Sequence, residues 1–479
     1  MTPGARGTAA RRAVLLAVAV LGAALLAWRL GRDGGGAPAR PPNATAGADS
    51  FTIWVVGGST ALGEPYAPRA DLGRIAAHLL GGDVNGRPIR VVNLGGAGKA
   101  AVAVVDDARR VARAVRAPES AVAFLYVGNN EFLGFDRRHD LRRRERALFD
   151  VPSVSQSERE DVFERYRESL QRIAAALQDA GIAVVAAATA VNLADWEPNR
   201  SVLADTAHAA TVRALLAEGE RLAAAGDAGG ALADFRRVLA IEPGFALASK
   251  RAGDCWRALG ERDSARACYQ RAVDCDGNPY RELSAQNAIL RQVCAARAIP
   301  VVDAPALLAA ASPDGLTGDG VFWDNCHPTL SGYLAIARGF AATVQARFGV
   351  RRPLRDATVA DLEAAFQIDA AFRRQVLHGR GQYCYAAATL VYAPGPRLRR
   401  ARRYLEAAVG MGPEDAGITC SLAVLTALDG DARASLELWR RAWRLDPVET
   451  RARAENRYVQ QIMAQRGVGD LLGQLRLGR

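Results

Sequence analysis

Four short apolar runs, separated by stretches with helical periodicity, constrain this chain more than any other feature. The runs are residues 51–57, 90–94, 121–127 and 181–189, and sheet-like sequence resumes at 299–303. Apart from Arg90 and Asn93 in the second run, they are largely apolar rather than alternating, which is typical of strands covered on both faces. The alternation of strand and helix therefore predicts an α/β fold with a parallel sheet.

Each of the first three runs ends at a glycine-rich turn. The turns read Gly57-Gly58-Ser59-Thr60, Gly95-Gly96-Ala97-Gly98 and Gly128-Asn129-Asn130-Glu131. Ligands of parallel α/β sheets bind at the carboxyl ends of the strands, which is where all three turns fall. The sequence therefore predicts a functional site built from these turns.

A serine hydrolase needs a nucleophile, a base, and a group that orients the base. Ser59 follows two glycines, which relax the steric limits on a sharp turn. Asp324 precedes His327 by three residues, so its carboxylate can orient the imidazole within one tight turn. The other histidines lie in helical or charged stretches and are expected at the surface: His78, His139, His208 and His378.

Ester chemistry also needs hydrogen-bond donors for the negatively charged oxygen of the intermediate. Gly98 can offer a backbone N–H, and Asn130 can offer a side-chain amide. Both residues lie on turns that follow parallel strands, so we expect them near Ser59. The region contains no nucleotide-binding motif and no cluster with metal-ligand spacing, so we expect neither a cofactor nor a metal.

Together these blocks resemble the SGNH (GDSL-type) esterase and lipase superfamily. The turn around Ser59 is similar to the nucleophile block, residues 93–98 match NxxxxG, the turn around Asn130 resembles GxND, and residues 324–328 match DxxHP. The resemblance covers about 51–205 and 285–350. It implies a flavodoxin-like, three-layer SGNH hydrolase fold with a parallel sheet.

The same resemblance implies a serine esterase or deacylase that cleaves an ester-linked acyl group through a covalent acyl-enzyme. Ser59, Asp324 and His327 would be catalytic. The oxyanion hole would consist of the backbone N–H groups of Ser59 and Gly98 and the side chain of Asn130. The expected substrate is an acyl ester, on a glycan or a lipid.

Two positions depart from the family pattern. The aspartate that precedes the nucleophile in the family is Gly58 here, and the aspartate after the third-block asparagine is Glu131. These departures keep two alternatives open. One is an O-acyltransferase that passes the acyl group to a glycan, and the other is an inactive SGNH scaffold whose repeats bind proteins.

A repeat occupies the long interval between Asn130 and Asp324. Five positions correspond at a spacing of 34 residues: Gly219, Gly226, Ala231, Phe235 and Pro243 align with Gly253, Gly260, Ala265, Tyr269 and Gly277. This period and the small residues at the helix crossing resemble tetratricopeptide (TPR) repeats. Near the C-terminus, Ala408 and Pro413 recur in the same way as Ala442 and Pro447, with Gly430 at the helix–helix turn. Such repeats imply a protein partner.

The N-terminus predicts a membrane anchor. Arg6, Arg11 and Arg12 precede the uncharged run 13–28, which spans about 24 Å as a helix, close to the thickness of a bilayer core. We expect an uncleaved signal anchor, with a cleaved signal peptide as the alternative. Either would place the rest of the chain outside the cytoplasm, in the periplasm or at the cell surface.

The expected organisation follows from these segments. It comprises a cytoplasmic stub and anchor helix at 1–30, a linker at 31–50, a discontinuous hydrolase domain at 51–205 and 283–350, an inserted TPR-like pair at 206–282, and a C-terminal helical TPR-like region at 351–479. The repeats are expected on the same side of the sheet as Ser59.

Composition narrows the partners. Half of the residues are hydrophobic and 24% are charged, which is typical of a globular protein. The net charge is +11, but the positive residues are almost all arginines spread over helical stretches without aromatic interleaving, so we expect no nucleic-acid partner. The seven cysteines form no CxxC pair. They predict buried thiols, with a disulfide among Cys255, Cys268 and Cys275 as the alternative for an exported domain.

Overall fold

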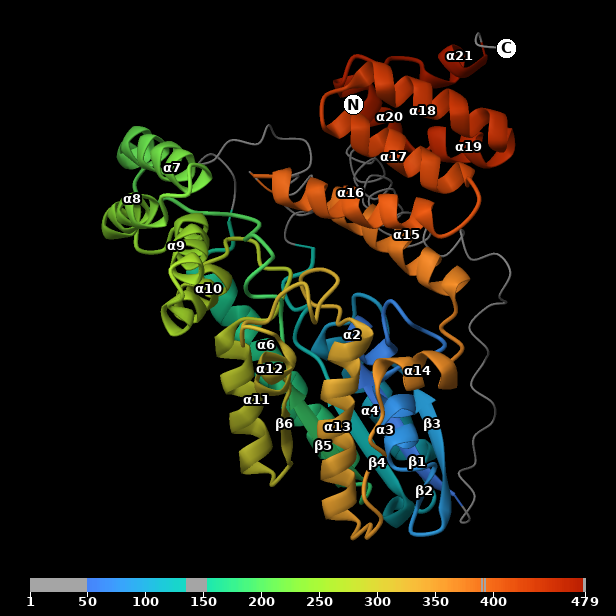
Figure 1. The fold of residues 1–479 in the computed structure, drawn as a ribbon. Coiled ribbons are helices and arrows are strands. Elements are labelled where there is room, and N and C mark those ends of the chain that lie inside the picture. The colour runs from blue at the N-terminus through green and yellow to red at the C-terminus, as the bar shows by residue number, and fades with distance from the viewer. Residues whose placement is uncertain (1–49, 135–152, 389–390, 392, 477–479) are drawn as a thin grey trace, which may run out of the picture. The chain divides into compact units, whose positions relative to one another are not determined.

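The computed structural model describes residues 50–134, 153–388, 391 and 393–476 (Figure 1). The chain divides into two compact units. Of the described residues, 50–369, 391 and 393 belong to the first, called here the α/β unit. Residues 370–388 and 394–476 belong to the second, called the helical unit.

The α/β unit is built on a six-stranded sheet with the order β2-β3-β1-β4-β5-β6. Its strands are β1 (Phe51–Gly57), β2 (Asp83–Val84), β3 (Arg87–Asn93), β4 (Ala121–Tyr126), β5 (Ala183–Ala188) and β6 (Val301–Asp303). All pairs are parallel except the short β2–β3 pair. The predicted mixed α/β architecture and its parallel strands are therefore confirmed.

Helices cover both faces of this sheet. On one face, Trp54, Leu125 and Ala186 share an apolar core with α4 (Ala101–Ala114), α6 (Gln156–Gln178) and α11 (Ser284–Ala296). The opposite face contacts α3 (Leu72–Leu79), α12 (Ala304–Ala311) and α13 (Leu330–Arg347). There the ring of Phe124 stacks on that of Phe340, with centroids 4.4 Å apart. The central strands β1 and β4 are buried throughout, which is why their sequences are almost continuously apolar.

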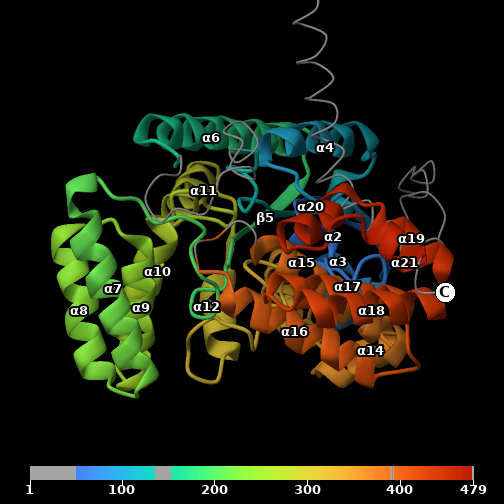
Figure 2. The same ribbon diagram turned by 90° about the horizontal axis from the view of Figure 1, so that it is seen from above.

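Two helical hairpins are inserted between β5 and α11 (Figure 2). Their helices are α7 (Ala209–Ala224), α8 (Ala228–Ile241), α9 (Ala246–Ala258) and α10 (Arg262–Asp274). A Cβ at Gly219 would lie 2.7 Å from the ring of Phe235, and one at Gly253 would lie 2.6 Å from the ring of Tyr269. The recurring glycines therefore allow an aromatic ring of the second helix to pack directly on the backbone of the first.

The helical unit contains two more hairpins and a covering layer. It comprises α15 (Ala370–Ala388), α16 (Gly395–Gly410), α17 (Ala416–Leu428), α18 (Ala432–Leu445), α19 (Pro447–Ala454), α20 (Arg457–Gln465) and α21 (Leu471–Arg476). Gly430 has φ +102° and makes the turn from α17 to α18, as its place in the repeat predicts. Met463 and Leu475 of the last two helices pack into the core around Trp439. Helix α14 (Val359–Ala365) belongs to the α/β unit.

The membrane prediction requires correction. The expected anchor at 13–28 lies outside the described residues. Within the ranges that the structure describes, no helix combines the length and the apolarity needed to cross a bilayer. The predicted membrane-anchored, extracytoplasmic location is therefore withdrawn.

The structure also decides two local points. All seven cysteines are free, so the disulfide alternative is wrong.

Helix α6 begins after Ser155, whose side chain forms a capping box with Glu158. Just before this cap, Val154 N–H donates to Gly277 O at 2.7 Å. This bond fixes the chain just before Ser155, so the helix can begin there.

Candidate active site

Ser59 lies at the point where β1 turns into the four-residue helix α2 (Ser59–Leu62). Gly57 has φ +150°, and a Cβ there would lie 2.0 Å from Tyr126 O. A side chain at this position is therefore excluded, and the glycine permits the sharp turn that brings Ser59 to the carboxyl end of the sheet. Because Ser59 is the first helical residue, its N–H belongs to the orphan donors of a helix start.

A hydrogen-bonded chain connects Ser59, His327 and Asp324. Ser59 Oγ lies 2.8 Å from His327 Nε2, and His327 Nδ1 lies 2.8 Å from one carboxylate oxygen of Asp324 and 2.9 Å from the other. Asp324 is fully buried, and the other two are nearly so. A carboxylate beside Nδ1 favours a proton on that nitrogen, which leaves Nε2 to accept the proton of the serine hydroxyl.

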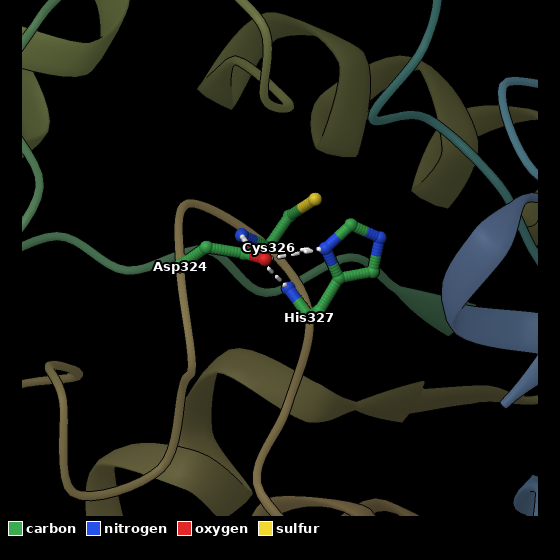
Figure 3. Close-up of side chains that lie close together, drawn as sticks. All are labelled: Asp324, Cys326 and His327. Carbon is green, nitrogen blue, oxygen red and sulfur yellow. Dashed lines mark hydrogen bonds and ion pairs between the residues drawn. The ribbon is translucent and has the colours of Figure 1, made fainter. Parts of the chain in front are cut away.

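The loop that carries Asp324 and His327 holds its own shape. Asp324 Oδ1 accepts the backbone N–H groups of Cys326 and His327 at 3.0 and 2.9 Å. Trp323 N–H donates to His327 O at 2.9 Å, which closes the turn from the other side. Figure 3 shows the carboxylate directed at both the imidazole and the backbone of the turn. One residue therefore fixes both the loop and the ring.

Asp324, Cys326 and His327 are also the described residues whose ligand atoms could approach a common metal ion. One ligand atom from each lies within 4.8 Å of the others. However, the hydrogen bonds from His327 to Asp324 and to Ser59 already occupy both ring nitrogens. A metal would have to break that chain, so the donor set fits proton transfer better than metal binding.

Of the two predicted oxyanion donors, Asn130 lies against the residue before Ser59, and Lys99, the neighbour of Gly98, does so as well. A Cβ at Gly58 would lie 2.9 Å from Asn130 Nδ2 and 3.3 Å from Lys99 O. Asn130 Nδ2 donates one N–H to Lys99 O at 2.9 Å, which leaves the second N–H of the amide for a ligand. Gly98, with φ +72°, precedes Lys99 on the same turn. The structure thus brings the turns after β3 and β4 together at the nucleophile.

Gly58 and Glu131, the two departures from the family pattern, have structural explanations. The missing side chain at Gly58 makes room for the Asn130 amide. Glu131 accepts the N–H of Ala101 at 2.9 Å and so attaches the turn after β4 to the start of α4. Burial raises the pKa of Glu131 to about 7. Neither position supplies a group to the Ser59–His327–Asp324 chain.

A cavity of about 330 Å³ adjoins the turn that carries Gly98. Leu133 Cδ1 lies 3.8 Å from the point that a Cβ on Gly98 would occupy, and Leu133 is one of the cavity's lining residues. The lining combines apolar side chains with three carboxylates and one guanidinium: Glu131, Phe132, Leu133, Gly134, Val154, Glu158, Asp161, Val162 and Arg165. A cavity of this size and mixed polarity can hold part of a small organic substrate.

Sequence reasoning missed the segment that follows the inserted repeats. Residues 280–286 contact both the loop that carries His327 and the turn that carries Asn130. The sequence carries a weak signal for this segment: Arg281 and Glu282 are adjacent charges that turn out to be buried. The surface prediction for the other histidines is only partly right, because His78, His208 and His378 are each half-buried, and His139 lies outside the described residues. The ring of His378 contacts Ser421.

Comparison with known proteins identifies the inserted helices. Residues 222–286 match the family model of the tetratricopeptide repeat, which confirms that part of the sequence interpretation. No curated protein matches the chain. The protein is therefore a mixed α/β protein with a tetratricopeptide repeat region, and such repeats generally bind other proteins.

Proposed function

We propose that this protein is an SGNH-type serine esterase or deacylase that cleaves an ester-linked acyl group. The observation that carries the proposal is the chain from Ser59 Oγ to His327 Nε2 at 2.8 Å and from His327 Nδ1 to the Asp324 carboxylate at 2.8 Å. Its order is that of nucleophile, base and orienting acid in serine hydrolases.

The topology supports a flavodoxin-like fold of the SGNH type. With the short antiparallel β2 set aside, the strands follow the order β3-β1-β4-β5-β6, in which the first strand of the chain lies second in the sheet. This is the strand order of flavodoxin-like folds, whose ligands bind where the strand order reverses. Here the reversal lies between β1 and β4, and the turns after these strands carry Ser59 and Asn130.

In the proposed reaction, His327 Nε2 takes the hydroxyl proton as Ser59 Oγ bonds to the ester carbonyl carbon. The N–H groups of Ser59, Gly98 and the Asn130 side chain then stabilise the negative charge on the carbonyl oxygen. Collapse of this intermediate breaks the bond to the alcohol oxygen, which takes the proton from His327. Water, deprotonated by His327, then releases the acid from Ser59 and restores the enzyme.

A fluorophosphonate probe that labels activated serines tests the proposal. The wild-type chain should be labelled at Ser59, and the Ser59→Ala variant should not. The exposed Ser157→Ala variant on α6 serves as a matched control and should be labelled like the wild type. If the folded wild-type chain resists the probe, the α/β unit is better explained as a scaffold for the repeats.

The repeats support a second function, the binding of a protein. The match to the tetratricopeptide repeat family at 222–286 carries this part of the proposal. A pull-down with the purified chain, compared with a variant carrying Gly253→Val, tests it. A Cβ at Gly253 would lie 2.6 Å from the ring of Tyr269, so the larger side chain should disrupt the second repeat and release a partner that binds there.

A further inference from the structure

The inserted repeats return to the α/β unit through residues 280–286, and this return segment contacts the loop that carries His327. Asn325, which lies between Asp324 and His327, donates its side-chain amide to Tyr280 O. Asn325 O accepts the N–H of Asn192, from the loop after β5, at 2.9 Å. Asn325 is therefore held from two directions, and one of its supports is the return segment.

The same return segment also holds the turn after β4. Glu282 N–H donates to Asn129 Oδ1 at 3.1 Å, and Gln286 Nε2 donates to Gly128 O at 2.8 Å. Gln286 is fully buried, and its Oε1 accepts Leu283 N–H at 3.0 Å as part of the start of α11. Glu282 and Gln286 therefore hold the two residues that precede Asn130. They belong to the same segment that contacts the loop of His327.

The segment is in turn anchored to the base of the repeats. The Asp276 carboxylate accepts the N–H groups of Asn199 and Arg200, at 2.8 and 2.9 Å, and so ties the end of the insert to its beginning. Asp274, the last residue of α10, accepts both the N–H and the hydroxyl of Ser284 at 2.8 Å. These bonds leave the return segment little freedom to move independently of α10.

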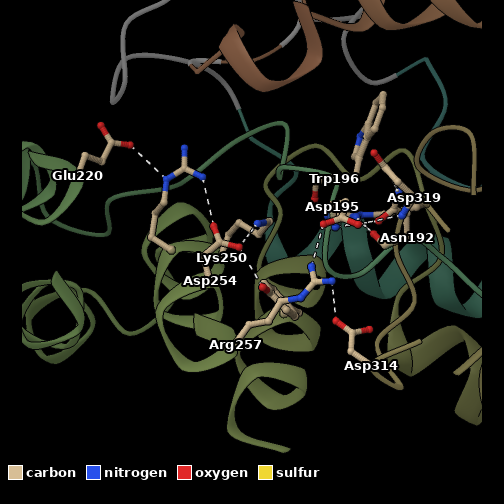
Figure 4. Close-up of polar contacts among 12 residues, drawn as sticks. Asn192, Asp195, Trp196, Glu220, Lys250, Asp254, Arg257, Asp314 and Asp319 are labelled. Carbon is tan, nitrogen blue, oxygen red and sulfur yellow. Dashed lines mark hydrogen bonds and ion pairs between the residues drawn. The ribbon is translucent and has the colours of Figure 1, made fainter. Parts of the chain in front are cut away.

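An ion-pair cluster fixes the repeats a second time. Arg257 of α9 contacts Asp195 at 3.0 Å, in the loop after β5 that also carries Asn192, and Asp314 at 2.5 Å, in the loop after α12 (Figure 4). Asn192 Oδ1 accepts the N–H of Asp195 at 2.9 Å. A continuous set of polar contacts therefore runs from α9 through Asp195 and Asn192 to the backbone of Asn325.

We propose that the return segment 280–286 is a positioning element that aligns the turn of Asn130 with the loop of Asp324 and His327. The positioning residues are Gln286, in the segment, and Asn325, in the loop that the segment contacts. The inference rests on the proposed esterase function. The proposed oxyanion donors lie on turns after β1, β3 and β4, whereas the base lies on the loop between α12 and α13. Their alignment therefore depends on contacts between distant segments of the chain. Misplacement by about 1 Å can cost about 100-fold in rate.

Two variants test the alignment. Gln286→Met keeps the length of the side chain but removes the donor to Gly128 O, and Asn325→Ala removes the donor to Tyr280 O. Each should lower kcat for a small aryl ester about tenfold or more and leave KM within about twofold. Gln292→Met is the matched control, because Gln292 lies on the same helix but is exposed and bonded to Arg167. It should keep the wild-type kcat.

A double-mutant cycle separates positioning from general destabilisation. If Gln286 acts through Asn130, Gln286→Met should lower kcat much less in an Asn130→Ala background than in the wild type. Additive effects, or an unchanged kcat in a folded Gln286→Met or Asn325→Ala variant, would overturn the proposal. If Gln286→Met does not fold, Asn325→Ala decides alone.

Hydrogen exchange distinguishes this inference from the proposed function. In Asn325→Ala, amides in 324–327 should exchange faster than in the wild type, and in Gln286→Met those in 128–131 should do so. Exchange that stays at the wild-type rate in both loops rejects the positioning role, whatever the activity. If the wild type is not labelled by the fluorophosphonate, the proposed esterase function is rejected. The exchange rates then still show whether the return segment holds the two loops in place.

Discussion

The α/β unit and the helical unit each contain a serine and a histidine joined by a hydrogen bond of nearly the same length. Ser59 Oγ lies 2.8 Å from His327 Nε2, and Ser421 Oγ lies 2.9 Å from His378 Nε2. Distance alone would treat the two pairs as equivalent. Their surroundings show that only the first pair is arranged for proton transfer from serine to histidine.

The direction of the hydrogen bond differs between the pairs. Ser421 lies inside α17, and its single hydroxyl proton goes back to Gly417 O at 3.0 Å. Its oxygen therefore accepts from His378, which acts as a donor rather than as a base. Ser59 begins a helix instead, so it has no carbonyl one turn before it in the helix, and its hydroxyl can donate to His327.

The second ring nitrogen differs as well. His327 Nδ1 faces the buried carboxylate of Asp324, which stabilises the imidazolium that forms when the ring takes a proton. Burial, together with the positive charge of Arg453, lowers the pKa of His378 to about 4. A histidine with so low a pKa is a weak base. The comparison shows that two serine–histidine pairs of equal length differ in the groups around them, and the proposed catalytic role of the first depends on that difference.

The largest expected effect separates the two histidines. His327→Ala should lower kcat for a small aryl ester by about 10⁴-fold or more, because the base for both steps is lost. His378→Gln should leave kcat unchanged. Steady-state kinetics on both variants, with circular dichroism to verify folding, make the measurement. Loss of activity in His378→Gln alone would reverse the assignment of the two pairs.

The next effect concerns the orienting carboxylate. Asp324→Asn should lower kcat by roughly 10³- to 10⁴-fold, since an amide cannot stabilise the imidazolium and favours the wrong ring tautomer. The amide oxygen can still accept the two backbone N–H groups of the turn, so the fold should survive. Asp415→Asn, at the start of α17 in the helical unit, is the control and should not change kcat. Equal kcat in Asp324→Asn and the wild type would contradict the triad.

Removal of one oxyanion donor comes third. Asn130→Ala should lower kcat by roughly 10²- to 10³-fold with little change in KM, the usual effect of one lost donor. The exposed Asn85, which donates to Phe348 O, supplies a control variant, Asn85→Ala. If Asn130→Ala keeps the wild-type kcat, the Asn130 amide serves only to hydrogen-bond Lys99 O and does not stabilise the oxyanion.

The sequence was most informative where function depends on residues close together in the chain. Asp324 and His327 share one turn, and a three-residue spacing places their side chains within reach. Ser59, Gly98 and Asn130 come from different strands, but each directly follows a strand of one parallel sheet. The rule that parallel strands end at the same edge was therefore enough to predict these turns at one edge of the sheet, and the structure places Asn130 beside Gly58 there.

Contacts between distant parts of the chain could not be predicted. Gln286 and Gly128 are separated by 158 residues, and no local pattern links them. Tyr280 and Glu282 lie within the expected insert, and no local pattern indicates that both also contact the candidate site. His378 misled in the same way, because its helix is rich in arginine and its contact with Ser421 of α17 joins residues 43 positions apart.

Glu131 provides a pH-dependent test within the α/β unit. Its folded pKa is about 7, above the ordinary value of 4.5, because burial disfavours the charged form. Between these values the unfolded chain loses its proton first, so stability should fall as pH rises from 4.5 through 7, by about 2–3 kcal/mol. Glu131→Gln keeps the acceptor for Ala101 N–H and should remove this slope. Native-state hydrogen exchange of β4 amides measures it, and an unchanged slope in the variant would contradict the assignment.

The smallest expected effect on stability comes from His378 in the helical unit. Its dependence on pH has the opposite sign to that of Glu131. The folded pKa of His378, about 4, lies below the ordinary value of 6.5, so between these values the unfolded chain binds a proton that the folded chain does not. Stability of the helical unit should therefore fall as pH decreases from 6.5 towards 4. The ring is partly exposed, so we expect only about 1–2 kcal/mol. Exchange of α17 amides at pH 7 and pH 5 measures the loss, and His378→Gln should abolish it. If the helical unit of His378→Gln still loses stability between pH 7 and pH 5, another group titrates in this range. The low pKa of His378 would then not explain the difference between this pair and Ser59–His327.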